Sequence, residues 1–234
     1  DAVFWKAMGN TFYYAFFVTI FKNIIGLTLG IIMAKKIFCQ TLFRVSAYMP
    51  VTFSYVVIGV LWSWIYNPMF GILNKFLMLV GAGSLIQGWL SDPNIALSSV
   101  MVVDVWKWMG FHMVLYMAGL QAISKDIYEA AEIDGANAII RFWKITIPQL
   151  NSTLVLNIML SVTGAFMTNY NLVNIMTGGG PFHSTEVLLT YIVRTAFSFS
   201  SLGKANAMSI ILFIFVFTFA FAQLKVMTRD ENYE

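Results

Sequence analysis

The sequence predicts an all-α, polytopic membrane protein that forms a single transmembrane domain over residues 1–234. Of these residues 59% are hydrophobic and only 11% are charged, with a mean hydropathy of +0.75. Soluble domains carry roughly 25% charged residues, so this composition excludes an ordinary soluble fold. Apolar stretches recur along the chain, each near the length of about 20 residues that a helix needs to cross a bilayer. Alternating strands typical of outer-membrane barrels do not occur.

Five segments are predicted to cross the membrane, and the second, fourth and fifth contain no charged residue. They are residues 11–34, 45–66, 96–121, 150–176 and 205–224. They are separated by polar loops, of which 122–148, 67–95 and 177–204 are the longest. The first residue is Asp1 and not Met, so we expect residues to precede it, with or without a further membrane segment.

Basic residues are distributed unevenly between the two sets of loops. With residue 1 outside, eight fall in inner loops and four in outer loops. The inner set is Lys35, Lys36, Arg44, Lys125, Arg141, Lys144, Lys225 and Arg229, and the outer set is Lys6, Lys75, Arg194 and Lys204. Lys and Arg accumulate on the cytoplasmic side. Loop 122–148 and the C-terminus are therefore predicted to be cytoplasmic, and loops 67–95 and 177–204 to lie outside.

The first segment contains the pair Gly26 and Gly30 and a lysine, Lys22, near its middle. Small residues four apart let helix backbones approach closely in lipid, so the glycines predict a helix-packing site. A lysine at this depth costs several kcal/mol, about 3 or more, unless it is paired or hydrated. Lys22 is therefore expected to face the bundle interior or a water-filled path.

The second segment carries Pro50, which is predicted to kink or unwind its cytoplasmic end. Trp62, Trp64 and Tyr66 close its outer end, as in an aromatic belt, and anchoring in the membrane is favoured over stacking on a solute for these three. A short apolar helix is expected at about residues 72–80 of the outer loop.

The third segment places Asp104 and Lys107 three residues apart, so they can pair along one helix face. Two interpretations have similar weight. The residues form a buried structural ion pair, or they line a polar cavity together with Trp108 and nearby Trp106 and His112. Neither His112 nor His183 has neighbours at metal-ligand spacing, so no metal site is predicted.

The fourth segment carries a stripe of small and polar residues at spacings of four, three, four and three, which is one face of an α-helix. The stripe is Asn157, Ser161, Gly164, Thr168 and Asn171. Such residues also hold membrane helices together, so packing is the alternative to a wet cavity. Asn169, Tyr170 and Asn174 add polarity at the outer end and favour a cavity. Amides and aromatic rings suit neutral sugars, which offer hydroxyl groups and C–H faces.

Residues 128–148, YEAAEIDGANAIIRFWKITIP, form a polar island between apolar segments. Asp126 and Glu129 are spaced as an N-cap and its capping-box partner. Gly135 is predicted to end the first helix in a left-handed conformation. A second helix should run through Phe142 and Trp143 and stop near Pro148.

Several kinds of chemistry lack their signatures. The sequence has no GxxxxGK[ST] phosphate loop, so this chain is not expected to hydrolyse ATP. No nucleophile–base pair, paired carboxylates or zinc-site spacing occurs in the loops, and no basic, aromatic-interleaved surface for nucleic acid is present. Cys39 is the single cysteine, which excludes an internal disulfide.

The island closely resembles the EAA loop of the membrane subunits of bacterial binding-protein-dependent ABC importers: EAA, three residues, Gly, then Phe142, Ile145, Ile147 and Pro148. The variant Asp134-Gly135-Ala136 resembles the sugar branch, as do LSDPNIAL and the run that begins TGGGP at 177. The resemblance covers nearly the whole chain and is to maltose-permease-like subunits. It implies the type I transmembrane domain of ABC importers, with about five crossing helices and a cytoplasmic coupling helix.

This resemblance implies an importer of a sugar or oligosaccharide in the bacterial plasma membrane that works by alternating access. The implied partners are a second, homologous permease with which the chain forms a heterodimer, two ATPase subunits that bind ATP and Mg²⁺, and an extracytoplasmic solute-binding protein. The implied coupling residues are Glu129, Ala130, Ala131, Asp134 and Gly135. The predicted substrate pathway comprises Lys22, Tyr55, Asp104, Lys107, Trp108, Asn157, Ser161, Thr168, Asn169 and Asn171.

Two alternatives remain at this point. The same importer class could carry another cargo, such as glycerol phosphate, a polyamine or an acidic oligosaccharide, since Lys22 and Lys107 lie inside the membrane. A secondary transporter or a membrane scaffold is the other alternative. A secondary transporter predicts inverted repeats, and none is evident in the sequence. The sequence does not name the sugar or the partner subunits.

Overall fold

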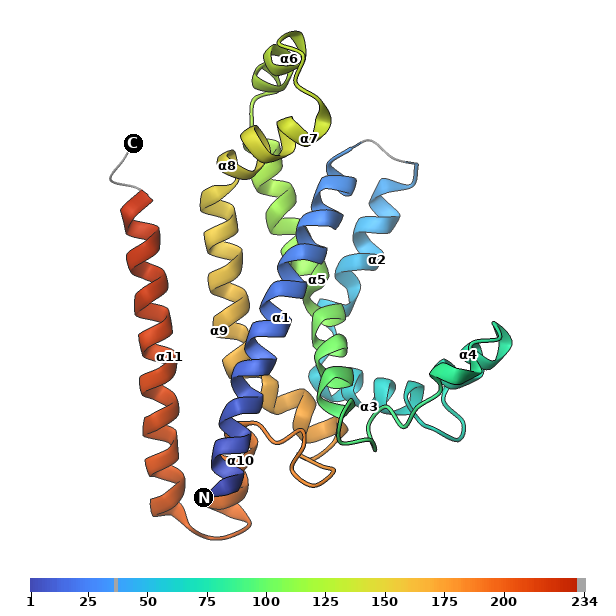
Figure 1. The fold of residues 1–234 in the computed structure, drawn as a ribbon, viewed down its shortest axis with the longest axis vertical. Helices are drawn as coiled ribbons and strands as arrows, with labels where there is room; N and C mark the ends of the chain where they lie inside the picture. Colours follow the sequence, from blue (N-terminus) through green and yellow to red (C-terminus); the bar gives the residue numbers. More distant parts are fainter. Residues whose placement is uncertain (36–37, 231–234) are drawn as a thin grey trace.

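The computed structural model describes residues 1–35 and 38–230 as a bundle of helices with no strand among them. Four long helices stand side by side, and a helical hairpin projects from one end of the bundle (Figure 1). They are α1 (Ala2–Ala34), α5 (Ala96–Ala122), α9 (Asn151–Met176) and α11 (Leu202–Asp230). The predicted inner positions of Lys36 and of the C-terminus fall on residues outside the described ranges.

Three of the described helices are long and apolar enough to cross a membrane by length and composition: α1, α9 and, over Leu202–Gln223, α11. They confirm the predicted spans at 11–34, 150–176 and 205–224, although α1 begins nine residues earlier than predicted. The span predicted at 96–121 is a 27-residue helix, α5, which has the length but is not among those apolar helices. Its polar side chains are buried against α1, α2 and α9.

The span predicted at 45–66 is broken. It forms α2 (Gln40–Thr52) and α3 (Tyr55–Ile65), which meet at an angle of 104° and would together make a fourth crossing. The sequence predicted that Pro50 would kink the inner end of this span, and the position of that kink is wrong. Pro50 lies within the last turn of α2, and the chain leaves the helix only after Thr52. Ser54 then caps α3 by accepting a hydrogen bond from the Val57 amide at 3.3 Å.

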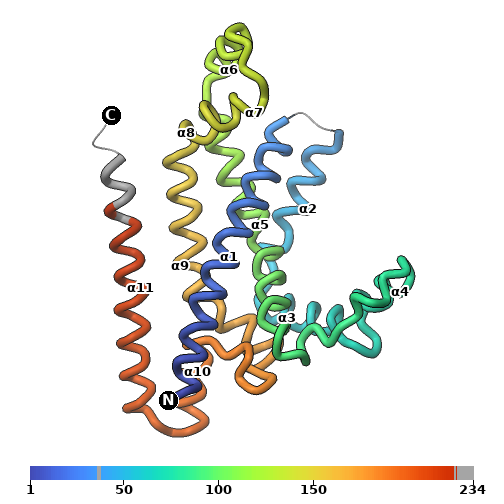
Figure 2. The backbone as a smooth tube through the Cα atoms, viewed as in Figure 1, coloured from blue at the N-terminus to red at the C-terminus, as the bar shows by residue number. Residues whose placement is uncertain are grey.

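The two ends of the bundle carry different elements (Figures 1 and 2). One end holds α6 (Lys125–Ile133), α7 (Ala138–Arg141), a π-helical turn (Phe142–Thr146) and α8 (Ile147–Gln149). The opposite end holds α3, α4 (Ile72–Leu79), a 3-10 turn (Gly83–Leu85) and α10 (Leu188–Phe197). Helix α4 confirms the short helix predicted at 72–80, whereas α10 was not predicted. Loops 122–148 and 67–95 thus lie at opposite ends, as the predicted topology requires.

Helices α1 and α5 approach each other closely because two glycines of α1 face α5. A Cβ atom added to Gly26 would lie 2.6 Å from Cβ of His112, and one added to Gly30 would lie 3.0 Å from Cβ of Tyr116. These separations are too short for any larger side chain without a shift. The structure therefore confirms the GxxxG pair as a helix-packing site.

Candidate functional site

A buried ion pair lies near the middle of the bundle. Lys22 Nζ of α1 is 2.9 Å from Asp104 Oδ2 of α5, and the two residues are 2% and 0% exposed. Lys22 thus faces the interior, as predicted. The predicted pairing of Asp104 with Lys107 is wrong, because Asp104 turns to the neighbouring helix. A charge pair inside a bundle persists only when both charges are matched at close range, and here they are.

Lys107 instead holds the break between α2 and α3. Its ammonium group donates to three backbone oxygens, those of Pro50 at 3.3 Å, Val51 at 3.2 Å and Phe53 at 2.7 Å. The Pro50 carbonyl also accepts from the Phe53 amide at 3.4 Å, and the break leaves these oxygens at a helix C-terminus, which carries partial negative charge. One buried cation therefore satisfies a broken backbone that lipid alone would not tolerate.

Two aromatic side chains surround these cations. The Lys107 ammonium lies 4.8 Å from the ring centroid of Tyr55 and 5.4 Å from that of Trp108, and the Lys22 ammonium lies 5.8 Å from the Trp108 ring. Trp108 Nε1 donates to the Tyr55 hydroxyl at 2.8 Å, which fixes the indole orientation. The structure thus brings together five of the predicted pathway residues: Lys22 from α1, Tyr55 from α3, and Asp104, Lys107 and Trp108 from α5.

A neutral hydrogen-bond network continues from this cluster across three helices. His112 shares hydrogen bonds with Asn157 Oδ1 at 2.8 Å and with Ser161 Oγ at 3.3 Å. Asn23 donates to Ser161 Oγ at 2.9 Å and accepts from the Tyr116 hydroxyl at 2.5 Å. Sequence reasoning missed Asn23 and Tyr116. Their only signal was a polar atom in an apolar helix, because no spacing within one helix reveals a partner on another.

The stripe on α9 therefore divides into two parts. Asn157 and Ser161 are buried in the network, so their position matches the packing alternative, although Ser161 also borders the cavity described next. Gly164 and Thr168 line a cavity of 230 Å³ together with Lys22, Trp108, His112 and Ser161; Phe111 and Leu160 complete the wall. Asn171 is half-buried beyond the cavity. Asn169 is fully buried on another face, and neither of its amide atoms has a hydrogen-bond partner among the described residues.

This cavity, which we call the polar cavity, has polar residues in its wall but a mostly apolar surface. Trp108 and Phe111 provide ring faces, whereas the hydrogen-bonding atoms of Ser161, Thr168 and His112 already bond within the bundle. The Lys22 charge is neutralised by Asp104 at 2.9 Å. The ring faces can stack on a neutral solute, and the polar atoms can bind its hydroxyl groups only by exchanging their present partners.

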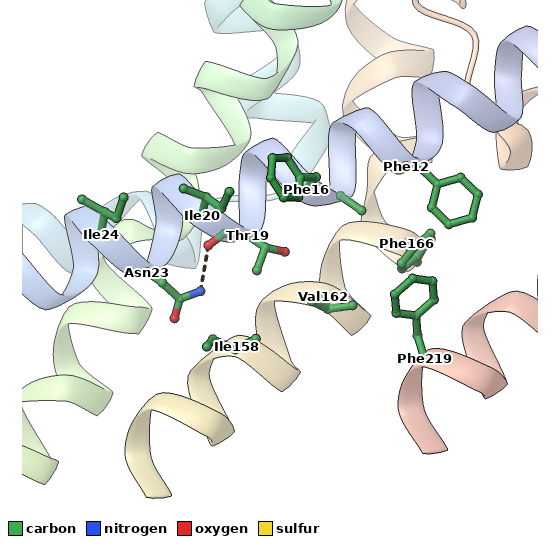
Figure 3. A pocket seen from close by; sticks show the side chains of 11 residues that line it. Phe12, Phe16, Thr19, Ile20, Asn23, Ile24, Ile158, Val162, Phe166 and Phe219 are labelled. Carbon is green, nitrogen blue, oxygen red and sulfur yellow. Dashed lines mark hydrogen bonds between the residues drawn. The ribbon is translucent and has the colours of Figure 1, made fainter. Parts of the chain in front are cut away.

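A larger cavity of 430 Å³ lies between α1, α9 and α11 and has a different character (Figure 3). Its wall is almost entirely aliphatic and aromatic, with Phe12, Phe166 and Phe219 at one end. Asn23 contributes an amide, but its Nδ2 atom already donates to the Thr19 carbonyl at 2.8 Å. A wall of this kind matches the hydrocarbon of lipid, so its greater volume does not make it the candidate path.

The polar island forms α6, which extends beyond the end of the bundle and has no buried residue (Figure 1). It ends as predicted: Gly135 has φ of +77°, its amide donates to the Glu132 carbonyl at 3.1 Å, and the Ala136 amide donates to the Ala131 carbonyl at 2.9 Å. These two bonds form a Schellman motif. Of the predicted coupling residues, Glu129, Ala130, Asp134 and Gly135 are exposed and Ala131 is half-buried.

Two details of the island differ from prediction. The N-cap is Ser124, whose Oγ accepts from the Asp126 amide at 3.2 Å, so Asp126 lies in the first turn and is not the cap. The second helical stretch ends at Gln149, next to Pro148 as predicted, but it is not one regular helix, because a π-helical turn (Phe142–Thr146) lies between α7 and α8. Pro148 itself lies in the first turn of α8, where a missing amide hydrogen costs little.

Two contacts fix the hairpin to its own base. The Tyr128 hydroxyl is 2.9 Å from Thr146 Oγ1, and Arg141 pairs with Glu132 at 3.0 Å. The hairpin therefore holds together as a unit beyond the bundle. No group of three or more His, Cys, Asp or Glu side chains in residues 1–35 and 38–230 is arranged to hold a metal ion.

A bundle of long apolar helices with a buried polar cluster and an exposed helical hairpin is the architecture of a helical membrane protein. The chain belongs to the family "Binding-protein-dependent transport system inner membrane component", whose model matches residues 26–227.

Particular relatives agree with this assignment. The probable ABC transporter permease protein YurN of Bacillus subtilis is 36% identical over 211 residues, which cover 89% of this chain and 72% of YurN. The sulfoquinovosyl glycerol transport system permease protein SmoG of Agrobacterium fabrum is 30% identical, with coverage of 90% and 67%. A solved bacterial ABC transporter involved in import of the acidic polysaccharide alginate has the same fold, with a TM-score of 0.87, 19% identity and coverage of 98% and 80%.

Proposed function

We propose that this chain is a permease subunit of an ATP-driven importer that carries a sugar or oligosaccharide across the plasma membrane by alternating access. Family membership supports the importer class. The cargo class is supported by the transport systems named for its relatives, including the trehalose/maltose system permease MalF of Thermococcus litoralis at 32% identity and the lactose system permease LacF of Rhizobium radiobacter at 34%. The ring faces of Trp108 and Phe111 in the polar cavity are compatible with it.

The observation that carries the proposal is the exposed hairpin at one end of the bundle. Helix α6 makes few contacts with the membrane helices, yet its exit at Gly135 is fixed by the Schellman bonds. An element that is rigid, polar and exposed is suited to seat in a partner. We infer that Glu129 contacts an ATPase surface, that Ala130 and Ala131 permit close approach, and that Asp134 and Gly135 set the exit of the helix.

The proposed assembly contains a second permease, two ATPase subunits and an extracytoplasmic solute-binding protein. ATP and Mg²⁺ bind to the ATPase subunits. Closure of the ATPases moves α6, the bundle tilts, and the polar cavity becomes accessible to the outside. The hairpin and the C-terminal end of α11 face the cytoplasm in this orientation, which agrees with the excess of inner basic residues.

A matched pair of glycine variants tests the coupling role. Gly135 and Gly81 have almost the same backbone conformation, with φ of +77° and +76°, and a Cβ at either position meets no atom within 4 Å. Leucine at either site therefore costs a similar amount of backbone strain, about 1–2 kcal/mol. Gly81 lies beyond α4, at the opposite end of the bundle.

In the purified complex, Gly135→Leu is expected to lose the ATPase subunits or its sugar-stimulated ATP hydrolysis. Gly81→Leu should keep the ATPase subunits bound. If Gly135→Leu assembled and hydrolysed ATP like the unmodified complex, the hairpin would not be the coupling element.

An anionic sugar is the second candidate cargo. Lys107 has no carboxylate partner among the described residues, so the cluster of Lys22, Asp104 and Lys107 has a formal charge of +1. Among the relatives, the permease UgpA of Brucella abortus is named for sn-glycerol-3-phosphate transport. Uptake competition between neutral and charged sugars in proteoliposomes separates the two. The neutral cargo is favoured because Lys22, the cation that lines the cavity, is already neutralised.

A further inference from the structure

The loop between α9 and α10, residues 177–187, is held to the bundle by an unusual number of side-chain bonds. Asn10 Nδ2 of α1 donates to the carbonyl oxygens of Ser184 at 2.9 Å and of Glu186 at 2.8 Å. Lys6 Nζ donates to the Phe182 carbonyl at 3.0 Å, and Thr11 Oγ1 accepts from the Leu188 amide at 2.8 Å. Two successive turns of α1 thus hold the loop through backbone atoms.

A buried carboxylate fixes the same loop from below. Glu186 is fully buried, and its Oε2 accepts from Arg194 Nη1 at 2.5 Å and lies 2.9 Å from His183 Nδ1. Arg194 Nη2 also donates to the Gly178 carbonyl. A Cβ on Gly179 would lie 2.6 Å from Glu186 Oε2, so the backbone passes directly over the carboxylate. We call this loop and its supports the outer clasp.

The outer clasp holds one large apolar side chain in solvent. Phe182 is 85% exposed, and both it and His183 have left-handed backbones, with φ of +50° and +57°. A bulky residue in this region costs roughly 1–3 kcal/mol, so the surrounding bonds must hold it there. A structure that fixes strained backbone and leaves an aromatic ring uncovered is suited to present that ring to a partner.

We propose that Phe182 is an anchor for the extracytoplasmic solute-binding protein, presented in a fixed position by the outer clasp. This inference rests on the proposed function. The clasp lies at the end of the bundle opposite the α6 hairpin, which is the outer end in the proposed orientation (Figure 1). The solved alginate transporter that shares this fold, with a TM-score of 0.84, is in complex with a periplasmic protein.

The energetics favour a single anchor of this type. A few aromatic residues near the centre of an interface carry most of its binding energy. An aromatic ring held on a rigid backbone loses little conformational freedom on binding, which strengthens association without further contacts. Phe182 therefore contributes through burial of its ring, whereas Lys6 and Glu186 contribute by keeping its backbone in place.

The experiment uses the complete importer in proteoliposomes and measures ATP hydrolysis against the concentration of its sugar-loaded solute-binding protein. Phe182→Ala should raise the half-saturating concentration about tenfold or more, with the maximal rate unchanged. Lys6→Met removes one hydrogen bond to the Phe182 carbonyl. It should raise the half-saturating concentration about two- to threefold, which is roughly the effect of one lost hydrogen bond. Phe213→Ala, a 66% exposed phenylalanine on membrane helix α11, is the control and should have no effect.

An unchanged half-saturating concentration for Phe182→Ala would overturn the inference. Loss of the second permease from purified Phe182→Ala complex would also overturn it, because the ring would then belong to a subunit interface. If the unmodified importer responded to no solute-binding protein, the proposed function itself would fail, which is a different outcome. An unchanged response for Lys6→Met alone would reject the role of the clasp in positioning Phe182.

Discussion

Removal of one partner of the Lys22–Asp104 pair should destabilise the bundle more than removal of both. Asp104→Asn keeps the size of the side chain but leaves the Lys22 ammonium buried without an opposite charge. The double variant Lys22→Met/Asp104→Leu replaces the pair with apolar groups of similar volume. Because buried ions lose their hydration, an apolar pair is often as stable as the ion pair it replaces.

The structure sets the expected size of the effect. At 2.9 Å, the attraction between the two unit charges is about 6 kcal/mol for an effective dielectric constant of about 20. Loss of one partner from a buried pair typically costs about 3–5 kcal/mol, within the roughly 5–15 kcal/mol that stabilises a whole domain. Asp104→Asn should therefore lose a large part of its folding stability, and the double variant should recover most of it.

The assay is the free energy of unfolding in detergent micelles, together with the fraction of protein that stays monodisperse after heating. Asp126→Asn is the matched control, since Asp126 is exposed on α6 and its substitution should change stability by no more than about 0.5 kcal/mol. The reasoning would be refuted if Asp104→Asn unfolded like the parent protein. It would also be refuted if the double variant were no more stable than Asp104→Asn.

Three further predictions concern the cavity, the helix break and the helix interface. Gly164→Leu should fill part of the polar cavity and reduce sugar uptake at least tenfold without loss of stability. The control is Gly9→Leu, where an added Cβ also meets nothing within 4 Å, and this variant should transport normally. Equal uptake by both variants would show that the cavity is not part of the transport path. Lys107→Met should remove three hydrogen bonds at the break, where only the Pro50 carbonyl keeps a bond from the Phe53 amide, and cost about 3 kcal/mol or more of unfolding free energy. A parent-like denaturation midpoint would show that the break needs no cation. Gly26→Leu should force α1 away from His112 and cost at least about 1–3 kcal/mol, measured by the same denaturation, and an unchanged midpoint would contradict the close approach.

Features set by local sterics could be predicted from the sequence. Gly135 had to take a left-handed conformation because the polar island needed a helix end there, and its φ is +77°. Gly26 and Gly30 predicted close packing because only small residues allow it, although the partner helix was not predictable. The apolar lengths gave α1, α9 and α11 directly. Helix α10 was missed because its ten residues are too short for a crossing, even though its sequence is amphipathic.

Features set by tertiary partners could not be predicted in this way. Helical spacing shows that Asp104 can reach Lys107, but it does not show that Lys22, 82 residues earlier, lies closer. The break after Thr52 contains neither Gly nor Pro at residues 53–54 and depends on Lys107 from another helix. The division of the α9 stripe into buried and cavity-lining parts depends on where His112 and Asn23 lie. In each case the deciding contact joins segments that are distant in sequence.

The charge balance at the middle of the bundle bears on how the membrane potential acts on this protein. Lys22 and Asp104 cancel each other, so Lys107 is the one uncompensated charge in this central cluster. A full charge that crosses the membrane responds by about 2.3 kcal/mol per 100 mV. If the ammonium shifts by about one tenth of the membrane thickness during the transport cycle, the potential contributes only about 0.2 kcal/mol. The switch between outward and inward states would then be nearly independent of voltage, and nucleotide energy would have to drive it.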